Sequence, residues 1–236
     1  MKNYEWLIFD VDHTLLNYTA DERVALIALF EENGLEVDEE RLSRCQFLSE
    51  DSWTNAGLYN VQNAEIQPVW HKLYRAHVSM IFSRYFTEYG VQGKDAIAFG
   101  VRFLTLLERA GNTMPHAAET LVALKEKGYK IALATNGVST IQKGRLRTLE
   151  GLYDKVFVSE EIGAIKPQAA FFESVLKGVG AKEEKCLMVG DSLSSDMLGA
   201  QRAGIDFVFY NGRKSAERPL GAVSCIDDLR ELLALL

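Results

Sequence analysis

The chain has 236 residues, of which 47% are hydrophobic and 25% are charged, as expected for a globular protein with a substantial core. Its net charge of −7 argues against a nucleic-acid backbone or an anionic membrane as the main partner. The 3 cysteines lack metal-ligand spacing, the first residues do not resemble a signal peptide, and no apolar segment approaches membrane-spanning length. We therefore expect a cytoplasmic protein of one large domain or two small ones, without disulfides.

An apolar run near the N-terminus ends abruptly at two carboxylates. Residues 7–9 are too few for a helix and rich in strand formers, which predicts a strand buried on both faces. Asp10 and Asp12 follow the carboxyl end of this strand, where ligands bind in open α/β sheets. Two acids with little solvent repel each other, which favours a bound cation or a proton-transfer role. The alternative is that Asp12 or Thr14 caps the following helix.

Residues 17–113 contain helical patterns and no convincing strand. The apolar residues recur at helical spacing over residues 21–33, 39–48, 67–89 and 95–110. Helices of this number and length form a bundle about the size of a small domain. We therefore predict a helical domain inserted directly after the first strand.

From residue 114 onward, strand and helix patterns alternate. Strands are predicted at 130–137 (with a polar turn at its end), 155–159, 185–191 and 206–211. Helices are predicted at 117–127, 139–149, 169–179, 195–203 and 226–236. Such alternation indicates an α/β fold, with a parallel sheet between helices on both faces and right-handed crossovers. The predicted domains are a core of residues 1–16 and 114–236 and an insertion of residues 17–113.

Acidic side chains follow two of the predicted strands. Asp10 and Asp12 end the first strand, Asp191 ends the strand at 185–191, and Asp196 lies near the start of the next helix. Neighbouring parallel strands are about 4.8 Å apart, so Asp10 and Asp191 can bind one hard cation if their strands are neighbours. Mg²⁺ suits such a site, because it is held by few carboxylates together with waters and substrate phosphate.

Groups that bind phosphate follow the strand at 130–137. Thr135 offers a hydroxyl, and the turn at Asn136-Gly137 offers backbone N–H groups ahead of a helix. Lys166, before the helix at 169–179, supplies a positive charge. The sequence therefore predicts a phosphate site made of Thr135, Asn136 and Lys166.

These residues together resemble the four motifs of the haloacid dehalogenase superfamily. The matching segments, in the family's order, are Asp10-Val11-Asp12-His13-Thr14, Thr135-Asn136, Lys166-Pro167, and Gly190-Asp191-Ser192 through Asp196. The resemblance implies a Rossmann-like parallel sheet of order 5-4-1-2-3, in which the first strand lies between those that end in Thr135 and Asp191. It also implies that residues 17–113 form a helical cap of the C1 class.

The resemblance further implies a role for each matched residue. Asp10 would attack phosphorus to form an aspartyl-phosphate, and Asp12 would move the protons. The Mg²⁺ ligands would be Asp10, Asp191 and the main-chain carbonyl of Asp12, with Asp196 acting through water or Lys166. Thr135, Asn136 and Lys166 would hold the phosphoryl group. The acid at position 12 favours phosphoryl transfer, because the dehalogenases of this superfamily lack it.

A closer resemblance is to the bacterial pyrimidine 5′-nucleotidases of this superfamily. It lies in Asp12-His13-Thr14-Leu15, Thr135-Asn136-Gly137, Arg145-Leu146 and residues 158–167. It implies a small phosphate monoester, a nucleoside 5′-monophosphate, as the partner, with no nucleic acid or membrane, and a monomer or homodimer. The alternatives are a phosphatase for a sugar phosphate or phosphoglycolate, a phosphomutase, and a non-catalytic binding protein.

Substrate choice is expected to depend on His13 and on residues of the insertion. The candidates for contact with a base or ribose are Trp53, Tyr59, Trp70, His71, Tyr74 and His77. His13 stands where many superfamily members have Gly, and it is either a loop residue facing solvent or the cap or a catalytic group. Trp53 lies in a polar, irregular stretch and is predicted to face the core and contact the substrate. Trp70, Tyr74 and His77 recur at helical spacing and are expected to pack inside the bundle, with contact to a base as the alternative.

Overall fold

The computed structural model describes residues 3–214 and 218–236, and within them six strands form one parallel sheet. The strands are β1 (Trp6–Phe9), β2 (Lys130–Thr135), β3 (Lys155–Val158), β4 (Cys186–Gly190), β5 (Asp206–Tyr210) and β6 (Ser224–Ile226). Their order in the sheet is β3-β2-β1-β4-β5-β6. The order predicted from the family resemblance is confirmed, and β6 extends it beyond β5.

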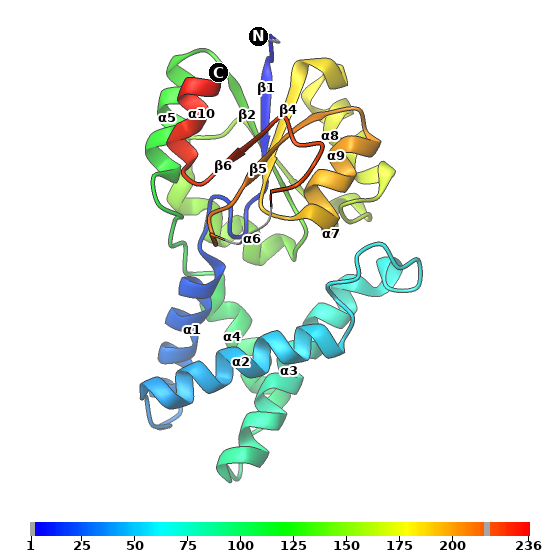
Figure 1. The fold of residues 1–236 in the computed structure, drawn as a ribbon. Helices are drawn as coiled ribbons and strands as arrows, with labels where there is room; N and C mark the ends of the chain where they lie inside the picture. The colour runs from blue at the N-terminus through cyan, green and yellow to red at the C-terminus, as the bar shows by residue number, and fades with distance from the viewer. Residues whose placement is uncertain (1–2, 215–217) are drawn as a thin grey trace.

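Alternate side chains of β1 enter two different hydrophobic layers, as expected of a strand covered on both faces. Leu7 and Phe9 pack with the apolar residues of α5 (Ala117–Glu126) and α10 (Leu232–Leu235). Ile8 packs on the opposite face with α8 (Ala169–Val179) and α9 (Leu198–Arg202). Figure 1 shows these two helical layers on either side of the sheet.

Four helices occupy the segment between β1 and α5 and lie together below the sheet in Figure 1. They are α1 (Tyr18–Glu32), α2 (Glu39–Asn55), α3 (Trp70–Tyr89, preceded by the 3₁₀ turn η1 at Gln67–Val69) and α4 (Ala96–Leu107). We refer to α1–α4 as the helical bundle. The side chains of Asn17, Asp38 and Asp95 cap the N-termini of α1, α2 and α4.

The chain enters and leaves the helical bundle through two adjacent crossings. The N–H of Asn17 donates to the carbonyl of Asn112 at 2.8 Å, and the N–H of Met114 donates to the carbonyl of Leu15 at 2.8 Å. Backbone hydrogen bonds therefore join the two crossings to each other at the carboxyl edge of the sheet.

The predicted elements are found, with differences at several of their ends. The prediction of a helix at 226–236 is wrong at its start, because Ser224–Ile226 pairs with β5 as β6. A capping box between Asp228 and Glu231 then begins the 3₁₀ turn η5 (Leu229–Glu231) ahead of α10. Residues 195–203 are not one helix, since a π-helical turn, η4 (Leu193–Met197), precedes α9. In addition, α2 extends to Asn55, and a short helix, α7 (Ser159–Ile162), follows β3.

The remaining turns complete the connections between strands. Helix α6 (Ser139–Arg145) continues into the 3₁₀ turn η2 (Leu146–Leu149), and the 3₁₀ turn η3 (Glu183–Lys185) precedes β4. None of the helices in the described ranges is both long enough and apolar enough to cross a membrane.

The buried acid Glu22 in α1 gives a pH-dependent prediction. Its side chain is 6% exposed and accepts a hydrogen bond from Gln46 at 3.4 Å. Burial raises the pKa of Glu22 from 4.5 to about 7. Because the folded state has the higher pKa, the stability that comes with the protonated form is lost as the pH rises from about 4.5 to about 7.

We therefore expect Glu22→Gln to raise the free energy of unfolding near pH 8 by about 2 kcal/mol and to leave it nearly unchanged near pH 4. Urea unfolding at both pH values measures the difference. Glu31→Gln, at an exposed position of the same helix, is the matched control and should change stability by less than about 0.5 kcal/mol. An equal gain at both pH values would show that the buried charge is not the cause.

Candidate active site

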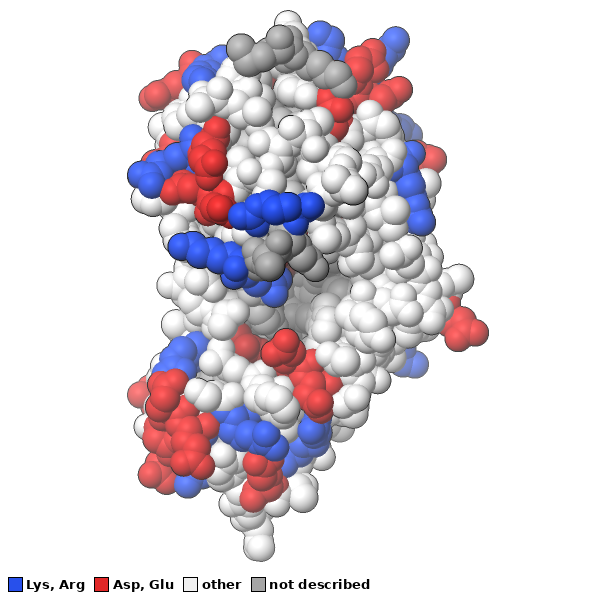
Figure 2. Space-filling view, in the orientation of Figure 1, with Lys and Arg blue, Asp and Glu red and all other residues white. Residues whose placement is uncertain are grey.

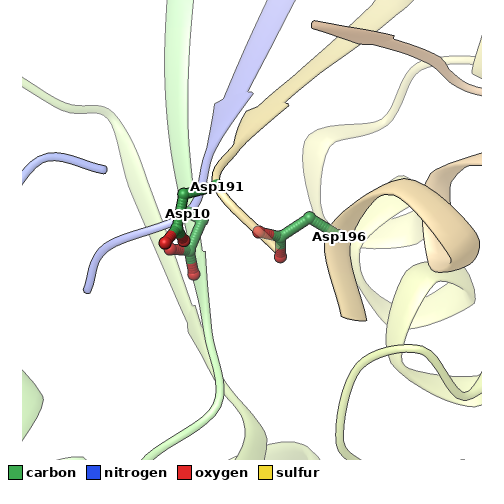
Figure 3. Close-up of side chains that lie close together, drawn as sticks. All are labelled: Asp10, Asp191 and Asp196. Atoms are coloured by element: carbon green, nitrogen blue, oxygen red, sulfur yellow. The ribbon is translucent and has the colours of Figure 1, made fainter. Parts of the chain in front are cut away.

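Three carboxylates meet at the carboxyl edge of the sheet. Asp10 follows β1, Asp191 follows β4, and Asp196 lies in the π-helical turn η4. One oxygen of each carboxylate lies within 4.8 Å of the others. Figure 3 shows Asp10 and Asp191 side by side at the ends of their strands, with Asp196 pointing toward them from the opposite side. The parallel pairing of β1 with β4 is what brings the first two together.

Lys166 is the buried cation of this cluster. Its Nζ donates to Asp10 Oδ1 at 2.5 Å and to the carbonyl of Ala134 at 2.8 Å, and it pairs with Asp196 at 2.8 Å. Thr14 Oγ1 donates to the other oxygen of Asp10 at 3.2 Å. The exposed Arg213 donates to Asp191 Oδ2 at 2.9 Å. Asp10 is thus fixed in one orientation by groups on both of its oxygens.

Negative charge is in excess within the cluster. Burial raises the pKa of the Asp10 carboxyl well above its usual range, the Lys166 ammonium opposes this rise, and Asp196 and Asp191 add to it. Burial also raises the pKa of Asp191 to about 6, with a further contribution from Asp196. A cation bound among these oxygens would relieve the repulsion, so the donor set fits a hard divalent ion.

Gly190 makes room for Asp196 at the end of β4. A Cβ atom at position 190 would lie 2.3 Å from Asp196 Oδ2, which is closer than atoms approach. Without a side chain there, Asp196 reaches the backbone N–H of Ser192 at 3.1 Å and Lys166 at 2.8 Å. The Gly-Asp sequence therefore serves the packing of Asp196 as well as the placement of Asp191.

Thr135, Asn136 and Lys166, which are predicted to bind phosphate, lie close together, but the side chains of Thr135 and Asn136 form hydrogen bonds within the protein. Thr135 is buried, and its hydroxyl accepts a hydrogen bond from Gln142 Nε2 at 2.6 Å. The amide of Asn136 holds the backbone of Lys166, accepting from its N–H at 2.7 Å and donating to its carbonyl at 3.0 Å. The N–H of Gly137 donates to Ser159 Oγ at 3.0 Å. The Asn136 amide therefore fixes the position of the Lys166 backbone.

Asp12 is held by Gln142 and Arg145, two residues that lie outside the four motifs. Gln142 Nε2 donates to Asp12 Oδ2 at 2.8 Å, and Arg145 Nη1 donates to Asp12 Oδ1. Burial alone would raise the pKa of Asp12, but the Arg145 guanidinium outweighs this effect and lowers it below the usual value. Gln142 and Arg145 are three residues apart in one predicted helix. Their spacing in the sequence therefore indicates that both side chains lie on the same face of that helix.

His13 has a backbone conformation that explains why glycine is suited to this position. Its φ of 64° lies in the left-handed region, which glycine adopts most easily. Burial lowers the pKa of His13 to about 4, so its imidazole is neutral near pH 7. The ring lies 6.0 Å from that of Tyr18 on α1, at the start of the helical bundle.

Trp53 is part of an aromatic cluster within the helical bundle. Its ring meets Trp70, Tyr74 and His77 edge-on at 5.7, 6.3 and 5.7 Å. These three neighbours are buried, as expected from their helical spacing. Polar contacts with the core are made by α3 and the preceding turn η1: His71 with Ser159 at 2.8 Å, Gln67 with Gln168 at 2.9 Å, and an ion pair between Arg75 and Glu160.

The face shown in Figure 2 is hollowed between the core and the helical bundle. Lys and Arg side chains gather along the core side of the hollow, and Asp and Glu side chains lie along the bundle side. Local positive charge of this kind attracts an anionic ligand even when the net charge of the protein is negative.

Comparisons with known proteins agree with this geometry. A family model described as haloacid dehalogenase-like hydrolase matches residues 4–204. The pyrimidine 5′-nucleotidase PynA of Streptococcus pneumoniae is 35% identical over 88% of this chain and 84% of its own length. The pyrimidine 5′-nucleotidase YjjG of Escherichia coli is 28% identical over 98% of both chains. The structure of Bacillus subtilis YfnB bound to magnesium, which reveals interdomain movement, matches with a TM-score of 0.83 and 28% identity over 100% of this chain and 99% of that one.

Proposed function

The chain belongs to the haloacid dehalogenase-like hydrolase family, and on this basis we propose that it hydrolyses nucleoside 5′-monophosphates through an aspartyl-phosphate intermediate. The observation that carries the proposal is the convergence of Asp10, Lys166 and Thr135 at one edge of the sheet, with Asp12 beside them. The pyrimidine nucleotide is suggested by the two nucleotidases that match most of the chain. We propose that the segment 17–113 acts as the cap.

The first chemical step is in-line attack by Asp10. As the substrate enters, the ionised Asp12 takes a proton from the phosphate monoanion. A carboxylate oxygen of Asp10 then forms a bond to phosphorus while the bond from phosphorus to the nucleoside 5′-oxygen breaks, and Asp12 passes that proton to the departing oxygen. Lys166 and Thr14 hold the Asp10 carboxylate in place. Lys166 also reduces the repulsion between Asp10 and the incoming phosphate.

The second step returns the enzyme to its starting state. Asp12, now ionised, takes a proton from a water molecule, whose oxygen bonds to phosphorus as the bond to Asp10 breaks. The products are inorganic phosphate and a free Asp10 carboxylate, and Asp12 returns to its ionised form by giving its proton to the departing phosphate. The ionised form of Asp12 that this step requires is the form that Arg145 and Gln142 stabilise.

We propose that Mg²⁺ is the cofactor. The carboxylates of Asp10 and Asp191 and the main-chain carbonyl of Asp12 would hold it, and the excess of buried negative charge supports this assignment. When bound, the ion supplies positive charge that stabilises the transferring phosphoryl group. The magnesium-bound B. subtilis relative supports the same choice of metal.

Initial rates over a panel of phosphate monoesters test the proposed function. We expect kcat/KM to be highest for pyrimidine nucleoside 5′-monophosphates, and we expect EDTA to abolish phosphate release until Mg²⁺ is restored. Sugar phosphates and phosphoglycolate on the panel identify a different phosphatase if they give the highest values. Isomerised substrate without free phosphate would identify a phosphomutase, and inactivity on the entire panel would contradict the proposal.

A further inference from the structure

Arg145 is a fully buried guanidinium that joins two carboxylates from different parts of the chain. Its Nη1 donates to Asp12, and its Nε donates to Asp21 Oδ2 at 2.8 Å. The side chains of Arg145 and Asp21 are both 0% exposed. The ring of Tyr18 lies over the guanidinium, with its centroid 5.2 Å away. A buried charge of this kind is expensive to separate from its partners, so the three charged groups are expected to move together.

Asp21 connects this group to the crossings between the core and the helical bundle. It lies in the first turn of α1, immediately after the first crossing. Its Oδ1 accepts hydrogen bonds from the second crossing, from the N–H of Gly111 at 3.0 Å and from the N–H of Asn112 at 2.7 Å. A Cβ atom at position 111 would lie 2.7 Å from the Arg145 carbonyl, so the second crossing also packs directly on α6.

Gln142 completes the support of Asp12 from the same helix. Its Oε1 accepts from Arg145 Nη1 at 2.9 Å, and its Nε2 donates to Asp12 Oδ2 and to Thr135 Oγ1. Each oxygen of Asp12 therefore has its own donor on α6. The Asp12 side chain remains 28% exposed, so these donors do not enclose it.

We propose that Arg145 is a positioning residue, which sets the orientation of Asp12 and links that orientation, through Asp21, to the crossings. The inference rests on the proposed function, because it assumes that Asp12 moves the protons of phosphoryl transfer. A displacement of α1 would shift Asp21, and Arg145 would follow, since neither buried charge can remain unpaired. The orientation of Asp12 would then depend on the position of the helical bundle.

The test separates the steps that need Asp12 from the step that does not. The leaving nitrophenolate of p-nitrophenyl phosphate needs little protonation, so formation of the phosphoenzyme appears as a burst that is nearly independent of Asp12. Release of phosphate from the phosphoenzyme, and attack on a nucleoside 5′-monophosphate, both need Asp12. Asp12→Asn therefore provides the reference pattern: a retained burst with slow turnover of both substrates.

We expect Arg145→Lys to reproduce this pattern. The burst rate should stay within about threefold of wild type, while steady-state turnover of both substrates should fall about tenfold to a hundredfold. Arg147→Lys, at an exposed position just beyond α6 that contacts Glu108 at 3.4 Å, is the matched control and should behave as wild type. A parallel fall of the burst and the steady state in Arg145→Lys would show a purely structural role and would overturn the proposal.

Asp21→Asn keeps the inference testable if Arg145→Lys does not fold. It retains an oxygen for the two backbone N–H groups and removes the charge that faces Arg145. We expect the same retained burst with a slowed steady state, and a steady state equal to that of wild type would contradict the link to the crossings. An inactive wild type would instead contradict the proposed function. Failure of the positioning role of Arg145 and failure of the proposed function therefore give different results.

Discussion

We expect Asp10→Asn to abolish phosphate release, by a factor on the order of 10⁴ or more, while the protein stays folded. An amide oxygen is a far weaker nucleophile than a carboxylate, and no other described acid holds the same place at the end of β1. The amide also removes one of the three carboxylate charges of the cluster, two of which pair with Lys166. Thermal stability in EDTA should therefore equal or exceed that of the wild type.

Phosphate release and thermal unfolding, measured on the same preparation, test this expectation. Asp95→Asn is the matched control, because it makes the same chemical change at an exposed helix N-cap where Asn serves as well as Asp. It should leave both activity and stability unchanged. Turnover above about a hundredth of the wild-type rate in Asp10→Asn would rule out Asp10 as the nucleophile.

Lys166→Met is expected to have the largest effect on stability. Lys166 is buried against Asp10 and Asp196, so its removal leaves two buried carboxylates without their cation. Breaking a buried ion pair from one side costs about 3–5 kcal/mol. We expect a loss of this size in the free energy of unfolding in EDTA, together with at least about a hundredfold loss of turnover.

The metal separates these two effects of Lys166→Met. Mg²⁺ should restore part of the stability, because it neutralises the same carboxylates, but it should not restore turnover, because the phosphate contact is lost. Urea unfolding with and without Mg²⁺ measures the recovery. Lys182→Met, at an exposed position, is the control and should shift stability by less than about 0.5 kcal/mol. An unchanged urea midpoint in Lys166→Met would contradict the ion-pair argument.

The positions of the acids could be predicted because they follow directly from the order of the strands. Asp10 and Asp191 each end a short apolar run, and parallel strands place such ends at one edge of the sheet. The family resemblance supplied the strand order that makes β1 and β4 neighbours. Local pattern and topology together therefore predicted which backbone positions meet.

The hydrogen-bond partners at those positions depended on packing and were harder to predict. The side chain of Asn136 was expected at the phosphate, yet both ends of its amide hold Lys166. Trp53 is predicted to face the core because its stretch is polar and irregular, but α2 continues to residue 55 and carries its ring into the aromatic cluster. β6 was missed because three residues give too short a pattern to separate from the following helix.

The paired crossings have a consequence for how such a chain can be rebuilt. The two crossings lie side by side and are joined by hydrogen bonds, so a short loop could connect them in place of the helical bundle. A different domain could also be inserted between the same two crossings. The graft must bring an acid in the first turn of its first helix. Without a counterpart of Asp21, Arg145 would lose one of its two carboxylate partners. An insert that replaces the helical bundle therefore needs an acid at this one position.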